Sequence, residues 1–220
     1  MRDLKYLFAY SIPLSTFFSI YFHGMWSYSS VFYAFVIIPL IEWRLKQPNT
    51  IYSDKEIEGR LKNKLFDLML YLNVPIVFGL LSYGLLTLHQ EVFAMYERIG
   101  ILSSLGILLA TNAINVAHEL GHRLSRFERT LSKLLYMPCL YMHFFLEHNY
   151  GHHKNMATSD DPATARYNQP LYSFWISSVI NQYKNAWKIQ FRLLSSKQKS
   201  FFSFENDMLF YLLFQGLYLG

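Results

Sequence analysis

Charge and cysteine are both scarce in this sequence. Only 16% of its residues are Asp, Glu, Lys or Arg and 52% are hydrophobic, whereas about 25% are charged in an ordinary soluble domain. A single cysteine, Cys139, excludes an internal disulfide framework and a thiolate metal cluster. No cleavage site of the A-x-A kind follows Arg2 and Lys5, so a retained membrane segment fits better than a signal peptide. The composition indicates an all-α integral membrane protein.

Long stretches without charge mark the expected membrane spans. Residues 6–41 carry no charged side chain and are long enough for two spans joined near Gly24. The expected segments are spans at about 6–23, 26–43, 68–90 and 99–117, a re-entrant or buried helix at 134–146, an interfacial helix at 171–183 and a truncated span from 208. We therefore expect one membrane domain over 1–220, a bundle of transmembrane helices with four complete spans and the start of a further one, incomplete at the C-terminus.

The basic residues set the expected orientation of these spans. The 20 Lys and Arg exceed the 15 Asp and Glu, but they lie between apolar runs and not on one polar face, which argues against a nucleic-acid partner. The loop at 42–67, with Ser53 or Asp54 as a helix N-cap, holds Arg44, Lys46, Lys55, Arg60, Lys62 and Lys64. Arg123, Arg126, Arg129 and Lys133 follow the fourth span. The positive-inside rule then places the N-terminus and the segment after 117 in the cytoplasm.

The first histidine motif, HELGHR, occupies residues 118–123, where the fourth span ends. His118 and His122 are four residues apart, so a helix would present both imidazoles on one face, able to hold one ion. By itself HExxH is also the signature of a zinc metalloprotease, with Glu119 as general base. This motif alone leaves both possibilities open.

The second motif, HFFLEHNYGHH, occupies residues 143–153. His148 and His152 repeat the spacing of four, and His153 adds a fifth imidazole. Five imidazoles exceed the three that hold a catalytic zinc, so they favour two metal ions, and nitrogen ligands suit iron, copper or zinc. His143 is expected to hydrogen-bond near the site rather than to bind metal. A metal-binding protein without catalytic activity remains an alternative.

Four carboxylates lie nearest the histidines in the sequence: Glu119, Glu147, Asp160 and Asp161. Carboxylates commonly orient metal-bound imidazoles by accepting a hydrogen bond from the second ring nitrogen. We expect these residues to act in that way, with capping or surface charge as their other possible role.

The motifs HELGHR, EHNYGHH and ATSDDPATAR, in this order behind four apolar spans, resemble those of the membrane-bound alkane 1-monooxygenases. That family is related to xylene monooxygenase and to the membrane fatty-acid desaturases, and a desaturase of the same superfamily is the nearest alternative. The resemblance implies a centre of two non-haem iron ions with His118, His122, His148, His152 and His153 as ligands. It also implies a bacterial inner-membrane enzyme that uses O₂ to hydroxylate the terminal carbon of an alkane drawn from the membrane lipid.

The resemblance further implies electron donors and more ligands. Rubredoxin and rubredoxin reductase would supply electrons, and the basic stretches at 60–64 and 123–133 are candidate docking surfaces for an acidic electron donor. The family carries a third histidine box and a further single histidine, and neither is present before Gly220. We therefore expect residues 1–220 to form an incomplete, inactive site.

Overall fold

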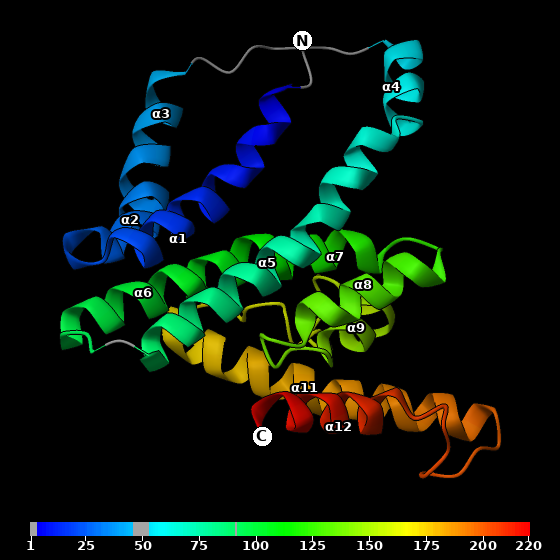
Figure 1. Ribbon diagram of the computed structural model, residues 1–220. Coiled ribbons are helices and arrows are strands. Elements are labelled where there is room, and N and C mark those ends of the chain that lie inside the picture. Colours follow the sequence, from blue (N-terminus) through cyan, green and yellow to red (C-terminus); the bar gives the residue numbers. More distant parts are fainter. Residues whose placement is uncertain (1–3, 46–52, 91) are drawn as a thin grey trace. The chain divides into compact units, whose positions relative to one another are not determined.

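The computed structural model describes residues 4–45, 53–90 and 92–220, and over these residues every regular element is a helix (Figure 1). Lys46 lies outside the described residues. Contacts divide the chain into two compact units, Met1–Val116 and Ala117–Gly220, and the expectation of one membrane domain over 1–220 stays a prediction. The histidine motifs both fall in the second unit.

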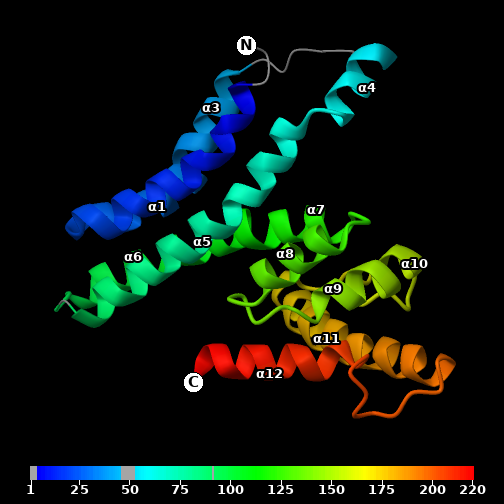
Figure 2. The same ribbon diagram turned by 45° about the vertical axis from the view of Figure 1, so that its right-hand side comes forward.

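The described residues of the first unit form helices, most of them apolar (Figures 1 and 2). In chain order they are η1 (Leu4–Tyr10), α1 (Ser11–Phe22), η2 (Gly24–Tyr28), α2 (Ser29–Phe32), η3 (Tyr33–Ile37), α3 (Ile38–Arg44), α4 (Asp54–Leu61), α5 (Lys64–Gln90), α6 (Met95–Leu108) and η4 (Leu109–Ile114), followed by α7 (Asn115–Gly121), with which the second unit begins. α1 packs against α5 and α6, which run side by side.

Three helices in the described residues are long and apolar enough to cross a membrane: Gly24–Arg44, Lys64–Gln90 and Met95–Gly121. Pro39 follows the π-helical turn η3, which fits a proline because its missing N–H and its ring disturb the normal α-helical bonding. The segment expected as the first span, 6–23, is helical over Leu4–Phe22. These apolar helices, like those expected from the sequence, make the chain an integral membrane protein.

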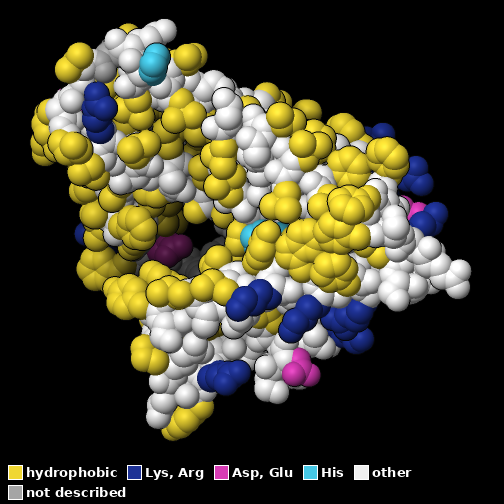
Figure 3. Space-filling model, turned by 90° about the horizontal axis from the view of Figure 1, so that it is seen from below, with side chains coloured by type: hydrophobic (Ala, Val, Ile, Leu, Met, Phe, Trp, Pro, Cys, Tyr) yellow, Lys and Arg dark blue, Asp and Glu magenta, His cyan; other side chains and the backbone are white. Residues whose placement is uncertain are grey.

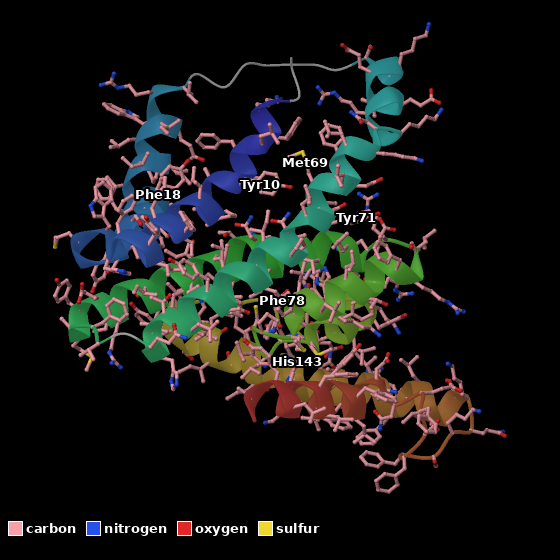
Figure 4. All side chains as sticks on the ribbon, in the orientation of Figure 1. Tyr10, Phe18, Met69, Tyr71, Phe78 and His143 are labelled. Atoms are coloured by element: carbon pink, nitrogen blue, oxygen red, sulfur yellow. The ribbon has the colours of Figure 1, made fainter. Side chains whose placement is uncertain are left out.

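Buried and partly buried hydrogen bonds join the helices of this unit. Asn112 donates to Asn73 Oδ1 at 2.8 Å, and Ser104 donates to the Ser27 carbonyl at 2.9 Å. Tyr10 of η1 donates to the carbonyl of Met69 in α5 at 2.6 Å, and the two residues lie close together in Figure 4. Such bonds hold apolar helices together because lipid offers the polar groups no other partner.

Two helices of this unit, α4 and α6, are capped at their N-termini. Ser53 caps α4 in a capping box with Glu56, as its position in the sequence predicts. Glu97 accepts a hydrogen bond from the Ala94 N–H at 2.9 Å at the start of α6, and another from the Gly24 N–H at 2.8 Å. One carboxylate thereby joins two turns.

The second unit carries the histidines on short helical segments next to a long helix. Its elements after α7 are α8 (Arg126–Tyr136), α9 (Phe144–Glu147), η5 (His148–His152), α10 (His153–Asn155), α11 (Leu171–Ser196) and α12 (Asp207–Leu219). α9 and η5 pack against α11, and α12 lies beside α11 in both ribbon views.

Two segments of this unit differ from their predicted extents. The expected helix at 134–146 is divided, because α8 ends at Tyr136 and α9 begins only at Phe144. Pro138 lacks an N–H for helix continuation, and Leu140 has a positive φ of 53°. The expected helix at 171–183 continues to Ser196.

Part of α11 reverses the pattern of a helix in a soluble protein. Its buried residues include the polar Ser178, Gln182 and Gln190 as well as the apolar Ala186, Ile189 and Leu194. Its exposed residues include Ile176, at 66% exposure, and Trp175, at 54%. Hydrophobic side chains likewise make up much of the face drawn in Figure 3, with Lys and Arg gathered in a band.

Candidate metal centre

The first histidine motif lies at the end of a helix that contains a π-helical turn. η4 precedes α7, which carries His118, and His122 follows immediately after α7 ends. The Nε2 atoms of His118 and His122 are 3.2 Å apart, and their rings meet edge to face. The spacing of four therefore brings the two imidazoles together as predicted from the sequence.

The second motif forms a π-helical turn, η5, over His148–His152. An α-helix would direct His152 toward His148 but turn His153 away. In a π-helix the residue five positions ahead lies over the first residue and the one four positions ahead lies beside it. The wider turn thus directs both His152 and His153 to the side of His148, with ring centroids 5.3 and 4.5 Å from that of His148.

The two motifs meet through their Nε2 atoms. His148 Nε2 lies 3.2 Å from His122 Nε2 and 3.1 Å from His153 Nε2. Potential ligand atoms of His118, His122 and His148 all lie within 4.8 Å of one another. These ring nitrogens carry lone pairs that face one another at short distance. A transition-metal cation bound among them would accept those lone pairs.

Asp161 orients the remaining imidazole of the motif. Its Oδ2 lies 3.0 Å from Nδ1 of His152, and its Oδ1 accepts the Ala163 N–H at 2.9 Å. With Nδ1 donating to the carboxylate, Nε2 of His152 keeps its lone pair for a metal. Burial opposes ionisation of Asp161, but hydrogen bonds from Thr164, Ala163 and His152 outweigh it and lower the pKa of the carboxyl.

Glu147 is fully buried beneath the second motif. Its Oε1 accepts a hydrogen bond from Asn185 of α11 at 3.2 Å, and its Oε2 has no partner. Burial raises the pKa of Glu147. Burial, together with the neighbouring imidazoles, lowers the pKa of His148 to about 3. A neutral imidazole is the form that binds a metal.

Gly151 lets the second motif lie directly on α11. A Cβ atom at this position would lie 2.8 Å from both Asn185 Nδ2 and Glu147 Oε1. Asn185 therefore supports the motif at two points, through its hydrogen bond and through this close approach. No sequence pattern identified Asn185, which lies far from the motif along the chain. Thr164, which donates to Asp161, could have been predicted because it follows a turn-forming Asp by three residues.

The other residues expected near the metal lie outside the imidazole cluster. Glu119 is exposed and pairs with Arg123 at 3.2 Å. Asp160 is exposed in the loop after α10. His143 is buried between Tyr141 and Tyr183, with ring centroids at 4.7 and 5.1 Å, and its Nε2 has no partner. Figure 4 shows His143 at the level of α11.

Helix composition and imidazole geometry together define a helical membrane protein with a histidine-rich metal site. The fatty acid desaturase family model matches residues 98–220. The chain therefore belongs to the fatty acid desaturase family.

Curated relatives are monooxygenases of hydrocarbons. The alkane 1-monooxygenase 1 of Alcanivorax borkumensis is 32% identical over 186 residues, which cover 82% of this chain and 46% of that protein. The alkane 1-monooxygenase of Pseudomonas putida is 30% identical over 79% of this chain and 43% of that protein. The xylene/toluene monooxygenase hydroxylase component of Pseudomonas putida is 28% identical over 94% of this chain and 54% of that protein. The chain spans about half the length of these relatives.

Proposed function

We propose that the whole protein is a non-haem di-iron monooxygenase. It would hydroxylate the terminal carbon of n-alkanes or related alkyl chains with O₂ and electrons from rubredoxin, which a rubredoxin reductase re-reduces. The observation that carries this proposal is the convergence of four Nε2 atoms, from His118, His122, His148 and His153, with His152 oriented beside them. The similarity to alkane 1-monooxygenases supports the choice of reaction.

The proposed ligands are these five histidines, as part of the set that holds two iron ions. Iron bound there would supply the activation of O₂ that oxidation of an unreactive C–H bond requires. Asp161 holds the proton on Nδ1 of His152 and so keeps Nε2 directed away from the carboxylate. Glu147 and Asn185 seat the second motif on α11 and thereby fix the direction of His148.

The membrane helices support the proposed substrate class, because alkanes partition into the bilayer and not into water. Met95–Gly121, a helix long enough to span, ends in the first histidine motif. A substrate that moves along such a helix would reach the metal without crossing the aqueous phase. The basic residues flanking the apolar runs support placing the N-terminus and the metal site in the cytoplasm, at the inner membrane of a bacterium.

A zinc protease explains the geometry less well. That hypothesis uses His118, His122 and Glu119, with His148 close enough to be a third ligand, but it leaves His153 and the Asp161-oriented His152 without a role. Catalytic zinc keeps about three protein ligands and an open position. Glu119 is also paired with Arg123 at the surface.

The test is to purify the whole protein and measure its metal content and its products. We expect iron, and 1-octanol labelled from ¹⁸O₂ when octane and reduced rubredoxin are supplied. His148→Ala should lose both iron and product, whereas Asp160→Asn should keep them. Zinc with peptidase activity that Glu119→Gln abolishes would support the protease instead, and an alkene product would support a desaturase.

A further inference from the structure

A cavity in the unit Ala117–Gly220 is lined by charged residues. It has a volume of about 530 Å³ and lies among α8, α9, η5, α11 and the start of α12, and no histidine lines it. Four cations and two carboxylates line it: Arg126, Arg129, Lys133, Lys197, Glu205 and Asp207. We call it the cationic cavity.

The cations of α8 lack full compensation. Arg129 is half-buried, yet its partners are the Tyr150 hydroxyl at 3.2 Å and the ring of Phe145. No carboxylate in the described part of the chain forms an ion pair with Arg126 or Arg129. Lys133 has one long ion pair, 3.5 Å to Asp207, and otherwise lies over aromatic rings. Partly buried cations are costly without an anion, so this wall favours a bound anionic group.

Another residue of the lining offers a hydrogen-bond acceptor. Gln190 is 1% exposed and lines the cavity, and its Nε2 donates to the Glu205 carbonyl at 3.0 Å. Its Oε1 is buried without a partner. Acceptors of this kind match a ligand that also carries hydroxyl donors. A phosphate with an attached glycerol has both an anion and hydroxyl groups.

Apolar surface adjoins the cavity. The loop just before α12 exposes Phe202 and Phe204, at 84% and 91%. α12 starts at Asp207, a residue of the cavity wall, and exposes Leu213 and Leu217. Aromatic rings beside lysines are typical of the membrane interface, where the charged heads reach the phosphates.

We propose that the cationic cavity binds the phosphoglycerol headgroup of an anionic phospholipid. The phosphate is held by Arg129 and Lys133, the glycerol hydroxyls donate toward Gln190 Oε1, and the acyl chains lie along α12. Arginine suits this role because its guanidinium can hold two phosphate oxygens at once. A cavity of this volume, with cations and an unpartnered acceptor in its lining, fits a small headgroup better than the surface of an acidic protein.

Native mass spectrometry of the full chain in neutral detergent tests this proposal. We expect phosphatidylglycerol to bind at least tenfold more tightly than phosphatidylcholine with the same acyl chains. Arg129→Gln combined with Lys133→Gln should remove that preference, and Arg129→Lys should retain part of it. The matched control is Arg192→Gln, because Arg192 is an exposed arginine of α11 that does not line the cavity. An unchanged melting temperature shows that each variant is folded.

Three results would overturn the proposal. The double variant could keep the full lipid preference of the unmodified chain. Inorganic phosphate at millimolar concentration could displace the lipid completely, which would indicate a site for free phosphate. The substitutions could weaken binding of an acidic electron donor while lipid binding stays unchanged, which would assign the cavity to a protein partner. None of these measurements depends on iron or turnover.

Discussion

Nδ1 of His152 lies 3.0 Å from Oδ2 of Asp161, a carboxylate whose side chain is completely buried. The same carboxyl group accepts the backbone N–H of Ala163 and the hydroxyl of Thr164. These bonds fix the carboxylate, and the carboxylate fixes the ring. The direction of His152 Nε2 is therefore determined by the loop after α10 as well as by the helix that carries the histidine.

Asp161→Asn should weaken metal binding. The amide cannot replace the negative charge that holds the proton on Nδ1, so we expect metal affinity to fall about 10- to 100-fold. Cobalt(II) titration of the metal-free chain, followed by visible absorption, measures the change. Asp160→Asn is the control, since Asp160 is the exposed neighbour. Equal losses in both variants would show that net charge, and not orientation of the ring, is responsible.

Gly151→Ala should lower stability. The added Cβ would meet Asn185 and Glu147 at 2.8 Å and Ile189 at 3.0 Å, which corresponds to a cost of about 1–3 kcal/mol from overpacking. The measurement is the melting temperature. Gly59→Ala should not destabilise, because no atom lies within 4 Å of a Cβ there. Adding Asn185→Ser to Gly151→Ala should recover part of the loss, and no recovery would place the strain elsewhere.

His143→Phe should make stability less sensitive to acid. Burial lowers the pKa of His143 to about 4, whereas the unfolded chain has the ordinary value of about 6.5. Between those values the unfolded state binds more protons, so the free energy of unfolding falls as pH drops, by at most about 3 kcal/mol. Phenylalanine keeps the ring contacts but binds no proton, so this part of the pH dependence is lost.

The measurement for His143 compares melting temperatures at pH 7 and pH 5. Between pH 7 and pH 5, the melting temperature of His143→Phe should fall less than that of the unmodified chain. His89→Gln serves as control because His89 is exposed. A parallel decline for all three proteins would contradict the prediction.

Cys139 should react slowly with thiol reagents. Burial raises the pKa of its thiol to about 11, so little thiolate is present at pH 7 and reaction with a maleimide should be about a hundredfold slower than for an exposed cysteine. Labelling followed by mass spectrometry, before and after unfolding in SDS, measures the ratio. Rapid labelling of the folded chain would show that the Cys139 environment opens.

The sequence predicted the membrane class and the histidines that meet, because hydropathy and a spacing of four follow directly from helix geometry. The π-helical turn could not be predicted, since HxxxHH is compatible with an α-helix that directs His153 elsewhere. The sequence also could not predict which of the two adjacent carboxylates contacts His152. Asp160 and Asp161 have the same chemistry, and only the loop conformation buries Asp161.

Contacts across long separations were the other part that the sequence did not predict. Asn185 supports Glu147 from α11, and no local pattern marks an asparagine in the middle of an amphipathic helix. Pro138 indicates a break between α8 and α9, but the length of the break depends on the turn at Leu140. Such features arise from tertiary packing, which overrides local preference.

The exposed apolar residues of α11 affect how the protein must be handled. Within the part of the chain that the structure describes, the three helices long enough to span a membrane end by Gly121, so residues 117–220 resemble a separable metal-binding part that water alone would dissolve. The outward Trp175 and Ile176 argue against that view. Cut away from the first unit, this portion would still aggregate unless detergent or lipid covered the outer side of α11.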